Sequence, residues 1–370
     1  MNLLKYRMRG SLIGGAVGDA LGYSIERDGY AEICRRYGCE RLSCYTLYLD
    51  EALERVARVS DNTQMALFTA NAMLNARAKG GDPLQEIRQA YIEWYYTQTL
   101  TPPEYQWTCR IGEDERLHVQ RSPANACMSS LDAISKGLRP HNNSKGCDAV
   151  ARIAPIAIYA AAGGRLIIDR SDSIAGEAAR MTHHHPMAYM PALVMAHIVR
   201  ELLAYDHPKR IHLKVSIVHA IESLHRMYPD NRSEWERINY LIKLAISLAI
   251  NEKEDIDNIK AIGRGRSGDE VLAIGIYCAL RYFDDFRWAL ATAVSHGGDS
   301  SSIGAVTGYI MGAAVSYRGI PRDFIDVLEM HDLIVHMADD LFKGKITKMP
   351  SSTPSRRTSS SHKQTARDEG

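Results

Sequence analysis

Residues 14–22 read GGAVGDALG, and residues 304–312 read GAVTGYIMG. In each segment glycine recurs every fourth residue. The glycines are Gly14, Gly18 and Gly22 in the first segment and Gly304, Gly308 and Gly312 in the second. A glycine inside a helix costs about 1 kcal/mol relative to alanine, so three on one helix face indicate that another group approaches closely there. The two segments therefore predict two central, tightly packed helices.

Apolar residues recur at helical spacing through much of the remaining chain. The segments with this period are residues 61–79, 84–99, 186–205, 211–227, 234–251, 269–282 and 323–342. Convincing period-two strands are absent, β-branched runs are short, and Pro, Asn and Gly mark loops at 101–103 and 141–145. The sequence predicts an all-α fold.

The bulk composition is that of a globular protein with a sizeable core. The chain has 370 residues, of which 45% are hydrophobic and 24% are charged. We expect one domain at residues 1–348. Residues 349–370 are Ser/Thr-rich and basic and lack large apolar side chains, which predicts a disordered tail. A localisation or secretion signal in the tail is the alternative that the sequence leaves open.

The net charge and the cysteine spacing argue against a nucleic-acid-binding protein, a disulfide framework and a zinc site. A net charge of +1 gives no basic footprint for nucleic acid. The seven cysteines form no C-x-x-C pair, which favours a reduced compartment, and Cys34, Cys39 and Cys44 make a poor zinc pattern. Because Asp19 interrupts the N-terminal apolar run and no apolar run reaches membrane length, we expect no signal peptide and no membrane span. A cytoplasmic location follows as an expectation, with export by another route and the oligomeric state left open.

Two of the expected helices begin with hydroxyl and carboxylate side chains. Residues 60–64 read SDNTQ, and residues 296–302 read HGGDSSS. Each stretch is typical of a helix N-cap, and Asp61 with Gln64 also matches a capping box. Together the two starts would offer the oxygen ligands that Mg²⁺ prefers, at helix N-termini, which attract phosphate. The combined interpretation is a phosphate-containing ligand held over a metal ion.

Three further segments carry residues of interest. Asp19 lies among the glycines and is expected to be buried, paired or capping a neighbour, whereas Glu26 lies past that helix and is free to face a cleft. Residues 144–155 form a glycine-containing loop that enters a helix and can present N–H groups to phosphate, although it does not match a Walker loop. Residues 183–185 are three adjacent histidines, for which we favour a loop and helix-start role over metal binding.

Taken in order, six segments resemble the ADP-ribosylglycohydrolase family over about residues 8–341. They are GGAVGDALG, SDNTQMAL, SKGCDAVARIAP, MTHHHP, GRGRSGDEVLAI and SHGGDSSSIGAVTGYIMGA. The resemblance implies a compact orthogonal helical bundle with two Mg²⁺ ions in its cleft. It also implies hydrolysis of the bond between ADP-ribose and a protein side chain, so ADP-ribose or an ADP-ribosylated protein is the expected partner. The ligand contacts that it implies are Tyr23, Ser24, Gly146, Cys147, Asp148, His183, Gly297 and Gly298.

The chain departs from the family pattern at several positions. The metal motif [ST]-D-D-[ST] appears as residues 60–63, with Asn62 in place of its second Asp. The motif D-x-D-[ST] appears as residues 299–302, with Ser301 in place of the Asp that bridges both ions. Asp148 stands where the phosphate loop usually has Gly, and Arg266 where a Trp is usual. Glu26 matches an acid found in one branch of the family.

These departures weaken the implied metal centre. Two Mg²⁺ ions about 4 Å apart repel by about 17 kcal/mol at an effective dielectric of about 20. Two of the family's four aspartates remain here, with Glu26 as a third anion, so we expect one weakly held Mg²⁺ ion or none. The expected metal ligands are Ser60, Asp61, Asn62, Asp299, Ser301 and Ser302. The expected catalytic residues are Glu26, Asp61 and Asp299.

The sequence leaves three functions open. The first is an ADP-ribosyl hydrolase with a reduced metal site. The second is a catalytically inactive pseudoenzyme that binds ADP-ribose or a partner, because fold resemblance does not guarantee retained chemistry. The third is altered chemistry on an ADP-ribosyl group.

Overall fold

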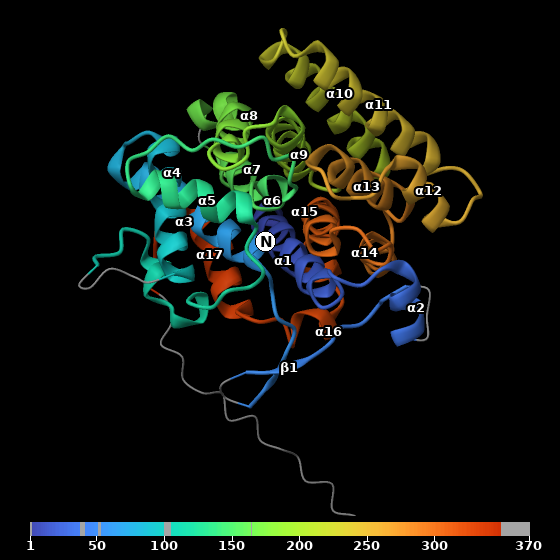
Figure 1. Cartoon of the computed structure of the whole chain (residues 1–370), viewed down its shortest axis with the longest axis horizontal. Coiled ribbons are helices and arrows are strands. Elements are labelled where there is room, and N and C mark those ends of the chain that lie inside the picture. The colour runs from blue at the N-terminus through green and yellow to red at the C-terminus, as the bar shows by residue number, and fades with distance from the viewer. Residues whose placement is uncertain (1, 38–40, 51–52, 100–104, 164, 349–370) are drawn as a thin grey trace, which may run out of the picture.

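The computed structural model describes residues 2–37, 41–50, 53–99, 105–163 and 165–348, and helices dominate them, as predicted (Figure 1). The α-helices are α1 (Leu3–Tyr23), α2 (Tyr30–Tyr37), α3 (Asp61–Lys79), α4 (Pro83–Gln98), α5 (Asn125–Ser135), α6 (Asp148–Ala151), α7 (Ala154–Ala161), α8 (Arg165–Arg180), α9 (Pro186–Ala204), α10 (Arg210–Met227), α11 (Arg232–Leu248), α12 (Asp255–Ile262), α13 (Gly268–Arg281), α14 (Phe286–Val294), α15 (Ser300–Gly319), α16 (Arg322–Ile325) and α17 (His331–Lys343). Two 3-10 turns, η1 (Arg110–Glu113) and η2 (Glu115–Leu117), follow α4. Strands β1 (Tyr48–Leu49) and β2 (Arg55–Val56) pair antiparallel and are too short to show an alternating pattern in the sequence.

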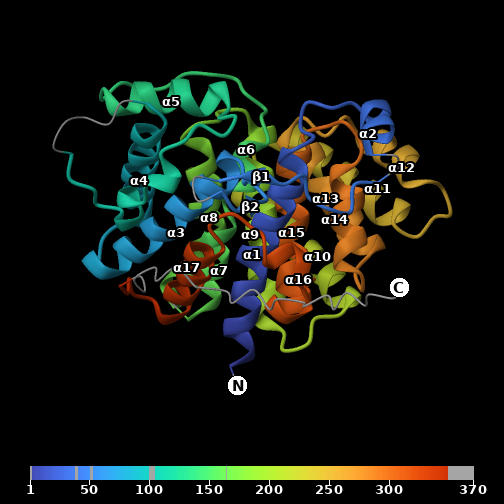
Figure 2. The same cartoon turned by 90° about the horizontal axis from the view of Figure 1, so that it is seen from below.

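Helices α1 and α15 run antiparallel and in close contact through the middle of the molecule (Figures 1 and 2). Their glycines face one another, and a methyl group added at Gly14 would overlap the carbonyl oxygen of Gly308. The facing pairs along the contact are Gly10–Gly312, Gly14–Gly308, Gly18–Gly304 and Gly22–Ser300. The predicted pair of close-packed central helices is confirmed. Because the helices are antiparallel, the C-terminal end of α1 lies beside the first residues of α15.

The other helices surround this central pair. Helices α3, α4, α5, α8 and α17 lie on one side of it, and α11, α12, α13 and α14 lie on the other (Figures 1 and 2). Helix α9 packs against α7, α8, α10 and α13. Within the described ranges α9 alone is long and apolar enough to cross a membrane, and 83% of that window is buried inside the protein.

The element boundaries match six of the seven segments predicted from apolar spacing to within three residues. The helix predicted at 323–342 is wrong, because α16 ends at Ile325 and α17 starts at His331. Between them Met330 takes a left-handed φ of 56°, and the Glu329 N–H donates to the Ala57 carbonyl. This turn ties the C-terminal helices to the strand that precedes α3. The predicted tail at 349–370 lies outside the described residues.

The central contact generates a stability prediction. The substitution Gly308→Ala should destabilise the protein by about 1–3 kcal/mol, because overpacking at the backbone of α1 outweighs alanine's helix preference. Chemical denaturation would measure this. Gly81→Ala is the control, since a methyl group there meets only the Lys79 Cβ at 4.0 Å, an ordinary van der Waals distance. A Gly308→Ala protein as stable as the parent would contradict the close approach of α1 and α15.

Candidate functional site

Asp19, near the C-terminal end of α1, anchors the start of α3. Its carboxylate accepts hydrogen bonds from the Ser60 N–H at 2.9 Å and from the hydroxyls of Ser60 and Thr63, both at 2.5 Å. Burial raises the pKa of Asp19 to about 6, although these hydrogen bonds oppose the shift. The expectation that Asp19 is buried and capping a neighbour is confirmed. The start of α3 is thereby tied to the end of α1 that meets α15.

The start of α3 is capped by Ser60, whose Oγ accepts a hydrogen bond from the Asn62 N–H at 3.1 Å. The capping box expected between Asp61 and Gln64 is wrong, since Asp61 is already helical and the Gln64 side chain accepts from Trp94 at 3.2 Å. Asp61 is buried, and its Oδ2 has no hydrogen-bond partner among the described residues. This oxygen is therefore available to a ligand.

The start of α15 collects side chains from two other elements. Asp299 is its N-cap, with Oδ1 accepting from the Ser302 N–H at 3.0 Å. The Ser301 hydroxyl donates to Glu26 Oε1 at 2.8 Å, just beyond the end of α1. The Cys147 thiol, at the start of α6, donates to Asp299 Oδ2 at 2.9 Å. The C-terminal end of α1 and the start of α6 thus meet the first turn of α15.

Asn62 joins the starts of α3 and α15. Its Nδ2 donates to Ser301 Oγ at 3.3 Å and to Ser302 Oγ at 3.2 Å. Its Oδ1 is buried and has no partner within the described part of the chain. The two helix starts that the sequence analysis identified are therefore joined by hydrogen bonds from Asn62 to Ser301 and Ser302.

Buried carboxylates gather around this junction and repel one another. Burial, followed by the charges of Asp148, Asp19, Glu26 and Asp299, raises the pKa of Asp61 well above its ordinary value. Burial and then Asp148 raise the pKa of Asp299. Burial and then Asp299 raise the pKa of Glu26 to about 8. A nearby cation would favour the ionised form of all these groups.

Asp148, the first residue of α6, faces His183. Its Oδ2 lies 3.6 Å from His183 Nε2, while His183 Nδ1 lies 2.9 Å from Thr182 Oγ1. Burial raises the pKa of Asp148, but the imidazole of His183 and then the charge of Arg152 outweigh this effect, so the net shift is downward. His183 is therefore the group that faces this carboxylate in the structure.

The three adjacent histidines point to different partners. His183 is fully buried beside Asp148. His184 Nδ1 accepts from the Asn142 N–H at 3.2 Å. His185 is the N-cap of α9, where its Nδ1 accepts from the Met187 N–H at 3.0 Å. Their predicted loop and helix-start role is confirmed.

Two pockets flank Glu26, which lines both of them. The first has a volume of about 330 Å³ and is lined by Ala124, Asn125, Ala126, Ser144, Gly146, Cys147, Asp148, His183, Arg266, Gly298 and Asp299. The second has a volume of about 440 Å³ and is lined by Tyr23, Ser24, Arg27, Asp28, Arg36, Tyr48, Arg58, Arg121 and Ser122. Gly297 lines neither and packs with a φ of 83° against the backbone of Gly29 and Tyr30. The expected ligand contacts other than Gly297 are therefore divided between the two pockets.

The sequence did not reveal the arginines of the second pocket. Arg27 directly follows Glu26 in the chain, but Arg36, Arg58 and Arg121 come from separate parts of it, with no common spacing and no motif. Arg36 pairs with Asp28 at 2.7 Å, and Arg121 pairs with Glu329 at 2.8 Å. Only the fold brings these cations to one side of Glu26.

The oxygen atoms at the helix junction suit a hard cation. Asp61 Oδ2 and Asn62 Oδ1 are buried and unpartnered in the described structure, and Mg²⁺ takes oxygen ligands of these kinds. The Ser60 hydroxyl is already held by Asp19. Across the described residues, no group of three or more His, Cys, Asp or Glu side chains is arranged to hold a metal ion. The donors at the junction are thus of a kind that fits a hard cation.

Two relatives align with most of the chain. The ADP-ribosyl-[dinitrogen reductase] glycohydrolase of Rhodospirillum rubrum is 24% identical over 328 residues, which are 88% of this chain and 90% of the relative. The ADP-ribosylarginine hydrolase Tri1 of Serratia proteamaculans (strain 568) is 23% identical over 353 residues, which are 91% of this chain and 79% of the relative.

The fold and the family model agree with these alignments. A solved structure titled ADP-ribosylglycohydrolase-related protein complex superposes with a TM-score of 0.64 and 20% identity, covering 94% of this chain and 100% of the other. That likeness shows a shared fold. The family model described as ADP-ribosylglycohydrolase matches residues 2–350. The chain therefore belongs to the ADP-ribosylglycohydrolase family.

Proposed function

We propose that this protein is a hydrolase that releases ADP-ribose from a protein side chain and that its cation site is reduced. The observation that carries the proposal is the junction of the α3 and α15 starts, where Asn62 binds Ser301 and Ser302. Unpartnered oxygens of Asp61 and Asn62 are buried at this junction. The two relatives are named for hydrolysis of ADP-ribosyl groups on dinitrogen reductase and on arginine, which supports a protein-linked substrate.

A cation at the junction would be held by Asp61, Asn62 and Asp299, with Ser301 and Ser302 beside it. When bound, one Mg²⁺ ion would supply the positive charge that orients ribose hydroxyls and a water molecule. We assign no direct ligand role to Ser60, because its hydroxyl holds the start of α3 to Asp19.

Glu26 is the group we propose for the proton transfer. It borders both pockets, accepts a hydrogen bond from Ser301, and has a pKa raised to about 8. A carboxylate with this pKa can exchange a proton near neutral pH. At this pKa the free carboxyl group is largely protonated near neutral pH, and a cation at the junction would lower the pKa and favour the anion. The anion would then remove a proton from the attacking water or stabilise the oxocarbenium-like state of the ribose.

The diphosphate of ADP-ribose would lie in the first pocket. Gly146 and Gly298 line this pocket without side chains, and the start of α15 attracts anions through its N–H groups. His183 adds a donor when it is not engaged by Asp148. The Asp148 carboxylate opposes a bound phosphate in the same pocket.

Incubation with a protein that carries ADP-ribosylated arginine tests the proposed activity. We expect release of free ADP-ribose, measured by chromatography, to require Mg²⁺ and to be lost in Asp61→Asn and Asp299→Asn. Binding of ADP-ribose without any release would favour the pseudoenzyme alternative, which Ser301 at the bridging position supports. A product other than ADP-ribose would indicate altered ADP-ribosyl chemistry.

Restoring the two missing charges should restore cation binding. We predict that Asn62→Asp with Ser301→Asp raises Mg²⁺ affinity by more than the roughly 100-fold upper range of changes outside the ligand shell. Ser301→Asp alone should give most of this gain, because its position serves both ions in the family. Isothermal calorimetry would measure it.

A control for this experiment places the same two changes at another helix start. Asn231→Asp with Ser233→Asp adds two carboxylates at the start of α11 and should leave Mg²⁺ affinity unchanged. If the Asn62 and Ser301 double variant binds no more Mg²⁺ than the parent, the junction is not a reduced two-metal site. Asp61 and Asp299 would then be buried helix-start residues only.

Removing the Asp148 carboxylate should tighten ADP-ribose binding. We predict higher affinity in Asp148→Gly, because a negative charge leaves the first pocket and His183 becomes free to donate. Asp148→Asn keeps the side-chain size and should also bind more tightly if charge is the cause. Calorimetry showing equal or weaker binding by both variants would contradict a phosphate-facing role for Asp148.

A further inference from the structure

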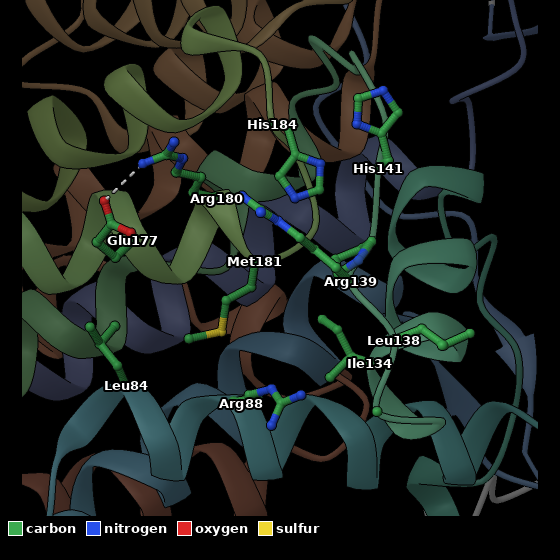
Figure 3. Close-up of a pocket in the computed structure, with 12 residues that line it drawn as sticks. Leu84, Arg88, Ile134, Leu138, Arg139, His141, Glu177, Arg180, Met181 and His184 are labelled. Atoms are coloured by element: carbon green, nitrogen blue, oxygen red, sulfur yellow. Dashed lines mark ion pairs between the residues drawn. The ribbon is translucent and has the colours of Figure 1, made fainter.

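A third pocket, of about 950 Å³, lies between α4, the end of α5 and α8 (Figure 3). Its apolar part is formed by Leu84, Ile134, Leu138 and Met181. Figure 3 shows Arg88 rising from α4 on one side of the pocket and Arg180 on α8 on the other. The remaining lining residues are Gly137, Arg139, Pro140, His141, Glu177 and His184. We call it the basic pocket.

The basic pocket has more positive than negative charge. Three arginines, Arg88, Arg139 and Arg180, line it with a single carboxylate, Glu177. Arg180 lies 3.6 Å from Glu177, and both side chains are about half exposed, at 52% and 42%, so this pair is weak. Arg88 and Arg139 are exposed and form no ion pair with any described residue. Unpaired guanidinium groups of this kind favour carboxylates or phosphates as partners.

The loop that carries His183 and His184 lies between the basic pocket and the candidate site. His184 lines the basic pocket, while His183, its neighbour in the chain, lines the first pocket beside Glu26. Helix α5 also borders both, through Ile134 near its end and Asn125 at its start. The two pockets are therefore neighbours across the loop that carries these histidines.

The shape of the basic pocket favours a peptide over a small anion. None of its charged side chains is buried, and Leu138 is 60% exposed at its edge. Sites for small molecules instead enclose the ligand with a few fixed polar groups. The arginines come from α4, the 137–141 segment and α8 and surround an apolar floor. This arrangement matches spaced carboxylates with an apolar side chain between them.

We propose that the basic pocket binds an acidic segment, with an apolar side chain, of the protein that carries the ADP-ribosyl group. This inference rests on the proposed function, which supplies a protein as the substrate. The acidic segment would dock at Arg88 and Arg139 while the modified side chain enters the first pocket, beside Glu26. The basic pocket would then select among ADP-ribosylated proteins without touching the reacting bond.

A peptide-binding experiment tests the pocket apart from any activity. The probe is a labelled peptide of about 12 residues, up to roughly 40 Å long, that combines glutamate with leucine and glycine. Its control has glutamine in place of glutamate. Fluorescence anisotropy on the full chain should show that the acidic peptide binds and the glutamine peptide does not. Binding should weaken by about tenfold in Arg88→Glu with Arg139→Glu and should weaken with added salt.

A matched charge reversal controls for net charge. Arg226→Glu with Lys243→Glu changes two exposed cations on α10 and α11 and should alter peptide affinity by less than about twofold. Equal binding of the two peptides, or equal effects of the two double variants, would overturn the proposal. Displacement of the peptide by AMP from the basic pocket would assign it to a small anion and would also overturn the proposal.

Kinetics separate this inference from the proposed function. With an ADP-ribosylated protein rich in acidic residues near the modified site, Arg88→Glu with Arg139→Glu should raise KM about tenfold and leave kcat unchanged. With free ADP-ribosylated arginine the same variant should behave like the parent. Equal effects on both substrates would contradict a docking role. Absence of turnover in the parent would refute the proposed hydrolase, while peptide binding would still decide the chemistry of the pocket.

Discussion

The contact between the backbones of α1 and α15 is the constraint on which the site depends. No side chain separates the helices at the four facing pairs, since even a methyl group at Gly14, Gly18 or Gly308 would overlap a carbonyl oxygen of the partner helix. The antiparallel arrangement brings Asp19 and Glu26, at one end of α1, to the start of α15. Asp19 in turn holds Ser60 and therefore the start of α3. The contact between α1 and α15 thus determines where α1, α3 and α15 meet.

The junction itself is held together by neutral groups. Asn62 donates to Ser301 and Ser302, so the starts of α3 and α15 are joined without a cation. Aspartates at 62 and 301 would repel Asp61, Asp299 and Glu26 unless positive charge were present. The neutral pair therefore removes repulsion from the free protein and, in our account, also removes the attraction that would hold a second dication. Under the proposed function, this neutral pair would account for both the joined helix starts and a reduced cation site.

Part of this organisation could be predicted from the sequence. Glycine spacing identified the central helices, because glycine repeated on a helix face has a strong physical reason, and the isolated Asp19 was expected to cap a neighbour. The capping residue of α3 was less predictable, since Ser60 and Asp61 are both good N-caps and only the hydrogen bonds to Asp19 favour Ser60. The break at Met330 has no glycine or proline to signal it. The arginines of the second pocket and of the basic pocket were not predicted, because most of them come from distant segments that only the fold brings together.

On our account, the joined starts of α3 and α15 form an ADP-ribose site with room for one cation. Calorimetric titration of the unaltered protein with ADP-ribose, in the presence and absence of Mg²⁺, tests it most directly. Our account predicts binding of one ADP-ribose in both conditions, with higher affinity when Mg²⁺ is present and one Mg²⁺ ion taken up per complex. Absence of ADP-ribose binding in both conditions would contradict it.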